Sequence, residues 1–132
     1  MTHALVTGIG GQDGGYLAAL LRARGHRVTG TTRGDPAAVA AALPADCAGT
    51  EVVRLDPADA GAIAACLDAA RPDVVYHLAA PADPNIAWRH PGAAMDAIVG
   101  GTARWLEHLV AHHPATRFVL AGSCQVFGPD SA

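Results

Sequence analysis

The chain has 132 residues, which is enough for one domain with a hydrophobic core and too few for two. Apolar residues make up 51% of it and charged residues 16%, the formal net charge is -3, and the mean hydropathy is +0.22. A weakly acidic chain without a basic run excludes nucleic acid as an expected partner. No uninterrupted apolar stretch is long enough to cross a bilayer, so no membrane association is expected either.

The three cysteines, Cys47, Cys66 and Cys124, are odd in number and far apart in the chain. This pattern argues against a disulfide framework and against a zinc site made from cysteines. Residues 1–3 lead directly into an apolar run, without the pattern of a signal peptide. We therefore expect reduced thiols and a cytoplasmic location.

The apolar pattern alternates between short runs typical of strands and longer runs with helical spacing. It predicts strands at residues 4–8, 27–32, 51–55, 73–80 and 116–122. It predicts helices at residues 13–24, 35–43, 56–70 and 92–112. A Pro-rich loop is expected between the fourth strand and the last helix. The residues of that helix expected to face inward are Met95, Ile98, Val99, Thr102, Trp105, Leu106 and Leu109.

This alternation of strands and helices indicates a parallel sheet covered by helices on both faces. Right-handed crossovers then give an α/β fold, a Rossmann-type doubly wound sheet with five strands in the order 3-2-1-4-5. No repeat and no linker-like segment divides the chain, so residues 1–132 are expected to form one domain.

Glycines dominate the turn after the first predicted strand, where residues 7–14 read Thr-Gly-Ile-Gly-Gly-Gln-Asp-Gly. Gly8 permits a tight turn, Gly11 lets the backbone approach a phosphate, and Gly14 lets the next helix pack closely. Bare backbone N–H groups and the positive end of a helix dipole meet here, which suits a pyrophosphate. We therefore predict a dinucleotide-binding domain. Further cofactor-binding residues of the turn are Gly10, Gln12 and Asp13.

The end of the second predicted strand distinguishes the two nicotinamide dinucleotides. An Asp or Glu there would bond to the adenosine ribose and repel a 2′-phosphate. In this chain no acid stands between the start of the second predicted strand and Asp35, and Arg33 lies 19 residues after Gly14, where a guanidinium could pair with a 2′-phosphate. NADP is therefore favoured over NAD. The alternative is that Arg33 is a solvated loop charge.

Two further segments lie at predicted strand ends. Asp56 follows the third strand, where it could meet the adenine edge, cap the next helix, or do both. Leu78, Ala79 and Ala80 end the fourth strand, where small residues leave room for a cofactor to cross the strand ends. Plain core packing is the alternative for these three residues.

Several motifs of this chain resemble those of the extended short-chain dehydrogenase/reductase family, whose members modify nucleotide sugars. They are the glycine turn, residues 55–59 (Leu-Asp-Pro-Ala-Asp), 78–80 (Leu-Ala-Ala), 101–102 (Gly-Thr) and 121–123 (Ala-Gly-Ser). Within the family, residues 11–14 (Gly-Gln-Asp-Gly), followed by Tyr16-Leu17 and later by Arg33, are most similar to the GDP-mannose 4,6-dehydratases.

The resemblance implies a cofactor site and a substrate. NADP would be held by residues 8–14, Arg33, Asp56 with Pro57, and residues 78–80. The substrate would be a nucleotide-sugar, and Ser123 would be the catalytic Ser/Thr whose hydroxyl hydrogen-bonds to the sugar. The long helix of the family commonly pairs between subunits, which makes Trp105 a candidate interface residue and a homo-oligomer the expected assembly.

Four departures from the family pattern fall on the substrate side. The dehydratases carry a Glu where this chain has Gln125, and an amide cannot take a proton from carbon as a carboxylate base does. Their Tyr is replaced by Phe127, their Gln-Ser-His-like run by residues 81–83, and their Asn or Asp by Ile98. Ser123 and Gln125 are therefore the candidate catalytic residues, in an altered catalytic site beside a conserved cofactor pattern.

The Tyr-x-x-x-Lys pair of the family lies on a helix after the fifth strand, followed by a sugar-binding region. Neither Tyr16 nor Tyr76 has a Lys four residues later, and the sequence contains no Lys. We therefore expect a truncated chain without the substrate domain, inactive alone and prone to associate through bare apolar faces. Three hypotheses stay open: the cofactor-binding half of a nucleotide-sugar dehydratase, epimerase or reductase, a non-catalytic dinucleotide-binding module, or an interaction subunit.

Histidines cluster near the end of the long predicted helix. His108 and His112 are four residues apart and could form a metal pair, but no Glu lies between them as in a metalloprotease helix. Solvated histidines that complement the helix dipole are the expected reading, so no metal site is predicted.

Overall fold

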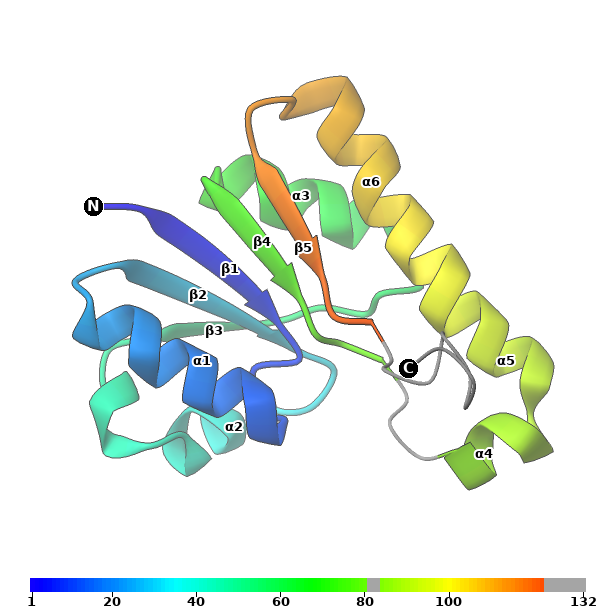
Figure 1. Ribbon diagram of the computed structural model, residues 1–132, viewed down its shortest axis with the longest axis horizontal. Helices are drawn as coiled ribbons and strands as arrows, with labels where there is room; N and C mark the ends of the chain where they lie inside the picture. Colours follow the sequence, from blue (N-terminus) through cyan, green and yellow to red (C-terminus); the bar gives the residue numbers. More distant parts are fainter. Residues whose placement is uncertain (81–83, 123–132) are drawn as a thin grey trace, which may run out of the picture.

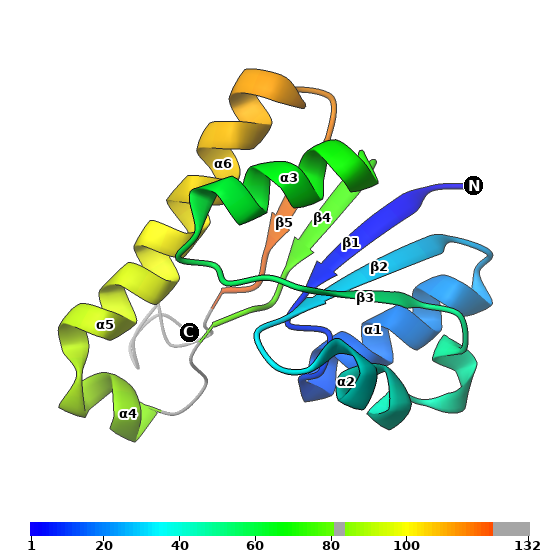
Figure 2. The ribbon, with the colours of Figure 1, turned by 180° about the vertical axis from the view of Figure 1, so that it is seen from behind.

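The computed structural model describes residues 1–80 and 84–122. A parallel five-stranded sheet in the order β3-β2-β1-β4-β5 forms its centre, and helices cover both faces (Figures 1 and 2). The strands are β1 (His3–Thr7), β2 (Arg27–Thr32), β3 (Glu51–Arg54), β4 (Val74–His77) and β5 (Arg117–Leu120). The predicted Rossmann-type class and strand order are confirmed.

The helices are α1 (Gln12–Ala23), α2 (Pro36–Ala42), α3 (Ala60–Ala70), α4 (Pro84–Arg89), α5 (Pro91–Met95) and α6 (Gly101–His112). A short 3-10 helix, η1 (Ala45–Cys47), precedes β3, and a π-helical turn, η2 (Asp96–Gly100), joins α5 to α6. In the described part of the chain, none of these helices has the length and apolar character needed to cross a bilayer.

Alternating side chains of the strands supply two separate cores, one on each face of the sheet. On β1, Ala4 and Val6 face α1, whereas Leu5 faces the opposite side. The first core is formed by Ala4, Val6, Ile9, Ala18, Leu21, Val28, Cys47 and Val74. The second is formed by Leu5, Leu55, Ile63, Leu67, Val75, Trp105 and Leu109, and it joins α3 and α6 to the sheet.

The segment predicted as one long helix differs most from expectation. It is divided into α5, η2 and α6, and α5 extends past the carboxyl end of β5 (Figure 1). Only Trp105 and Leu109 of the expected inward set are fully buried, because they are one turn apart on the stripe that meets the sheet. The side chains of Met95, Ile98, Val99 and Leu106 are exposed.

Two local predictions are also wrong. The helix expected from residue 56 begins at Ala60, because the Asp59 carboxylate accepts a hydrogen bond from the Ala62 N–H (3.0 Å) and caps it. The region expected as a Pro-rich loop contains α4, which begins at Pro84, and proline suits the first turn of a helix.

Candidate functional site

The turn between β1 and α1 is held against the end of β2. The N–H groups of Gly8 and Ile9 donate to the carbonyl oxygen of Thr31 (3.1 and 3.2 Å), and Gly8 has φ +70°, a left-handed conformation that glycine adopts without strain. Gly14 lies where α1 presses on this turn. A Cβ there would be 2.5 Å from the Gly8 oxygen and 2.7 Å from the Ile9 Cα.

The N-terminus of α1 has no side-chain cap. Gly11 is the N-cap residue, and among residues 1–80 and 84–122 no side chain caps the first N–H groups of the helix. These donors and the positive end of the helix dipole therefore face the turn unneutralised by a cap. Such an end binds an anionic group, of which a phosphate is the usual example.

A cleft of about 540 Å³ opens at the carboxyl ends of β1, β2 and β4, beside this helix end. Its size is typical of a cofactor site. It is lined by Thr7, Gly8, Gly10, Gly11, Gln12, Asp13, Gly14, Thr31, Thr32, Arg33, Val39, Leu55, Pro57, Leu78, Ala79, Ala80, Ala97, Trp105 and Ala121. Every predicted cofactor-binding residue except Asp56 thus lies at one cleft. That they bind a cofactor stays a prediction.

The turn after β2 contains Arg33, and Asp35 is the first acidic residue that follows this strand. The Gly34 N–H donates to the Thr32 hydroxyl (3.1 Å), and the Asp35 carboxylate accepts from the N–H groups of Ala37 and Ala38 (both 3.3 Å) as the cap of α2. Arg33 lines the cleft and makes no hydrogen bond or ion pair with the described residues. A cation that none of the described residues pairs with therefore stands where a 2′-phosphate is expected.

Asp56 stabilises a turn and does not cap α3. Its Oδ1 accepts from the Ala58 N–H at 2.9 Å, an Asx turn that leads to the true cap, Asp59. The cap alternative for Asp56 is therefore wrong, and its contact with an adenine stays a prediction.

Thr7 and His77 are the main residues of this region that sequence reasoning missed. The Thr7 hydroxyl accepts hydrogen bonds from the N–H groups of Leu78 and Ala79 (both 3.1 Å) and lies 3.0 Å from Nδ1 of His77. It positions the start of the loop whose residues line the cleft. The only sequence signal was a buried polar residue at the end of each of two neighbouring strands.

Trp105 forms part of the cleft wall and belongs to the core. It is 1% exposed, and its ring centroid lies 6.0 Å from that of His77. Its Nε1–H has no hydrogen-bond partner among the described residues. The sequence left core and subunit interface open for Trp105, and the structure supports the core, because the side chain is already buried against the sheet.

The two candidate catalytic residues, Ser123 and Gln125, lie outside the described residues, as do Phe127 and residues 81–83. Ala121, which directly follows β5, is the described residue nearest to them in the sequence that lines the cleft. Their roles stay predictions.

Comparison with known proteins gives the family. Residues 4–132 match the NAD dependent epimerase/dehydratase family, and the chain belongs to it. It is 34% identical to GDP-mannose 4,6 dehydratase 1 of Arabidopsis thaliana over 95% of this chain and 38% of that protein. The predicted similarity to GDP-mannose 4,6-dehydratases is thereby confirmed.

Two solved structures have the same fold. A putative epimerase from Burkholderia cenocepacia J2315 is 33% identical with a TM-score of 0.78, over 99% of this chain and 40% of that one. The UDP-glucose-4-epimerase from Stenotrophomonas maltophila, solved with bound NAD and formylated UDP-arabinopyranose, is 25% identical with a TM-score of 0.82, over 97% and 39% of the two chains. The chain thus spans less than half the length of the proteins it matches.

Proposed function

We propose that this chain is the NADP-binding half of a nucleotide-sugar-modifying enzyme of the GDP-mannose 4,6-dehydratase type, a lyase. The observation that carries the proposal is the uncapped N-terminus of α1, which opens into a cleft lined by Arg33. A pyrophosphate fits the N–H groups of the first turn of α1, and Arg33 fits a 2′-phosphate. Bound there, a nicotinamide dinucleotide supplies hydride transfer.

The residues of the chain then divide into two groups. The glycine turn, Arg33, Asp56, Pro57 and residues 78–80 bind and orient the cofactor. Ser123 hydrogen-bonds to the hydroxyl of the sugar, and Gln125 stands at the position of a catalytic acid or base without being able to transfer a proton itself.

A second candidate function is a dinucleotide-binding module that performs no chemistry. It is favoured by Gln125 and Phe127, which lack the carboxylate and hydroxyl that the dehydratases carry. The substitution Gln125→Glu distinguishes the two in a chain joined to a sugar-binding region of a relative. Turnover of GDP-mannose gained only with Gln125→Glu would favour the non-catalytic module, whereas turnover with the native Gln125 would favour the enzyme.

The direct test of NADP binding is titration calorimetry with NADP and NAD. We expect tighter binding of NADP, and Arg33→Ala should weaken NADP binding by about tenfold or more while leaving NAD binding unchanged, because a charge-assisted pair is lost. Arg24→Ala is the matched control, since Arg24 is an exposed arginine at the other end of α1. Equal affinity for both dinucleotides would contradict the role of Arg33.

We also propose that the protein is a homo-oligomer and resides in the cytoplasm. Several apolar side chains on α5, η2 and α6 are exposed, namely Met95, Ile98, Val99, Leu106 and Val110. In addition, β5 is an edge strand of the described sheet. Such surfaces promote association. The three cysteines are odd in number and far apart in the sequence, a pattern typical of reduced thiols in a reducing compartment. Light scattering at micromolar concentration should give a dimer or larger species, and a monomer would contradict this.

A further inference from the structure

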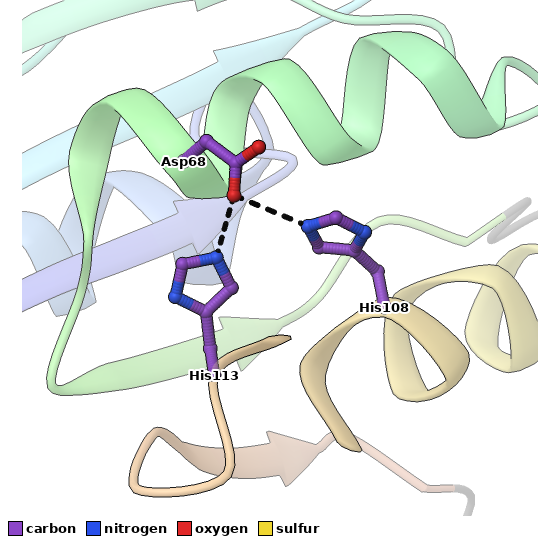
Figure 3. A group of neighbouring side chains, drawn as sticks. All are labelled: Asp68, His108 and His113. Atoms are coloured by element: carbon purple, nitrogen blue, oxygen red, sulfur yellow. Dashed lines mark hydrogen bonds and ion pairs between the residues drawn. The ribbon is translucent and has the colours of Figure 1, made fainter. Parts of the chain in front are cut away.

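Three side chains from two helices that are distant in the sequence meet outside the cofactor cleft. Oδ1 of Asp68, on α3, lies 2.8 Å from Nε2 of His113 and 3.3 Å from Nε2 of His108, on α6 (Figure 3). The three atoms all lie within 4.8 Å of one another. Figure 3 shows both imidazole rings directed at the same carboxylate oxygen. Two imidazole nitrogens and one carboxylate oxygen therefore converge on one point.

The packing of α3 against α6 holds these residues in place. Leu67 and Leu109, the chain neighbours of Asp68 and His108, are both buried in the same core. His113 ends α6, and its N–H donates to the Leu109 oxygen at 2.8 Å. Asp68 and His108 therefore lie on helices beside buried residues, and His113 is the C-cap residue of α6.

Two hydrogen bonds also join the segments that follow these helices. The Thr116 hydroxyl donates to the Pro72 oxygen at 2.7 Å, and the Arg117 N–H donates to the Asp73 oxygen at 3.0 Å. The distance between the helix ends is thus fixed independently of the three side chains. This pre-organisation lowers the entropy cost of gathering ligands around an ion.

We propose that Asp68, His108 and His113 bind a divalent transition-metal ion, with Zn²⁺ as the ion of best fit. Zinc takes imidazole nitrogen and carboxylate oxygen at about 2.0–2.2 Å in a tetrahedron, which sets neighbouring ligand atoms about 3.4 Å apart. The spacings of 2.8 and 3.3 Å to Oδ1 need only small side-chain rotations to reach that value. A water molecule completes the tetrahedron.

The exposure of the three side chains suits such an ion. The histidine side chains are 17% and 14% exposed, and that of Asp68 is 60% exposed. The imidazoles are therefore shielded, while the carboxylate side stays open for entry of the ion and for the water. The pair His108 and His112, which the sequence suggested, is not the arrangement observed. His112 is exposed, and its ring contacts that of His108 at a centroid distance of 4.5 Å without joining the cluster around Asp68.

The site is separate from the cofactor cleft. Asp68 precedes β4 by six residues and His113 precedes β5 by four, so the cluster lies at the amino ends of these strands, whereas the cleft lies at carboxyl ends. A bound ion would fasten the ends of α3 and α6 to each other. The proposed role is therefore structural, and it does not depend on the binding of NADP.

The test is Zn²⁺ titration of the full chain, free of any purification tag, in a phosphine reductant. We expect one Zn²⁺ per chain and a higher Tm with Zn²⁺ than with Mg²⁺, which prefers an all-oxygen shell. Asp68→Asn, His108→Gln and His113→Gln should each weaken Zn²⁺ binding by about tenfold or more, while the matched control His112→Gln should stay within about twofold. Co²⁺ should give visible bands of nitrogen and oxygen coordination.

Three results would overturn the site. They are wild-type Zn²⁺ binding no tighter than that of the variants, a loss with His112→Gln as large as with His113→Gln, or a near-ultraviolet thiolate band with Co²⁺, which would assign the ion to a cysteine. Circular dichroism checks the fold of each variant, and the three single substitutions make the result independent of any one that fails to fold.

Discussion

The Thr7 hydroxyl lies 3.0 Å from Nδ1 of His77, which joins the end of β1 to the end of β4 across the sheet. The hydroxyl oxygen accepts hydrogen bonds from the N–H groups of Leu78 and Ala79. The hydroxyl therefore uses its one O–H to donate a hydrogen bond to His77. Nδ1 is then an acceptor, and the ring is the neutral tautomer with its proton on Nε2. One buried hydroxyl thereby places the strand end that lines the cleft.

Thr7→Val removes this hydroxyl and keeps the shape of the side chain. We expect a loss of about 2–3 kcal/mol in the free energy of unfolding, because Nδ1 of His77 and two backbone N–H groups lose a partner in a buried place. Urea denaturation measures the loss. Thr7→Ser keeps the hydroxyl and is the control, which should lose clearly less. Equal stability of the two variants would show that the hydroxyl has no such role.

The imidazole of His77 makes stability depend on pH. It is 3% exposed and stacks on Phe118 at a centroid distance of 5.5 Å, and burial lowers its pKa below the ordinary value of 6.5. As the pH falls through 6.5, the unfolded chain takes up a proton that the folded protein does not hold. The free energy of unfolding should therefore decrease towards acid, by at most about 1.4 kcal/mol per pH unit from this group.

Urea denaturation between pH 7.5 and 5.5, after removal of metal with a chelator, measures this dependence. His77→Asn cannot titrate and should show a shallower decrease. Part of the decrease should remain, because burial and Arg27 also lower the pKa of His3. A pH dependence identical in wild type and variant would exclude His77 as its source.

Local sequence signals predicted the sheet and the glycine turn, whereas contacts between distant residues escaped them. The spacing of Gly8, Gly11 and Gly14 and the alternation of strands with helices are each contained in a short window. The bond between Thr7 and His77 joins residues 70 positions apart, and that between Asp68 and His113 joins residues 45 apart. Such pairs form only after the sheet order brings their elements together.

The exposed side of α5, η2 and α6 shows a second reason why part of the structure could not be predicted from the sequence. The helical spacing of Met95, Ile98, Val99 and Leu106 was indistinguishable from that of a core stripe, but the sheet reaches only Trp105 and Leu109. Hydrophobic periodicity indicates which residues share a helix face and does not show what covers it.

Asp56 and Asp59, the two aspartates after β3, are expected to have different roles, a cofactor contact for Asp56 and the helix cap for Asp59. Asp59→Ala should lower the free energy of unfolding by about 1 kcal/mol, because the cap of α3 is lost, and should leave NADP affinity unchanged. Asp56→Ala should weaken NADP binding if its carboxylate meets the adenine. Urea denaturation and calorimetry on both variants measure the two effects. Unchanged NADP affinity in Asp56→Ala would restrict Asp56 to its turn with Ala58.

Replacing Gly14 or Gly15, two adjacent residues of α1, by alanine should change the free energy of unfolding in opposite directions. At Gly14 a Cβ would meet backbone atoms, the Gly8 oxygen at 2.5 Å and the Ile9 Cα at 2.7 Å, so α1 must move away from the turn. We expect Gly14→Ala to cost about 1–3 kcal/mol of stability and to weaken dinucleotide binding, since the phosphate donors move with the helix.

At Gly15 the nearest atom to an added Cβ is Cδ of Pro44 at 3.5 Å, an ordinary contact. Gly15→Ala should therefore stabilise the protein, by up to about 1 kcal/mol, through the higher helix propensity of alanine. Urea denaturation and NADP titration of both variants test the pair. If Gly14→Ala were as stable as Gly15→Ala and bound NADP equally well, α1 would not press on the turn, and its N-terminus could not be the fixed phosphate site proposed for this chain.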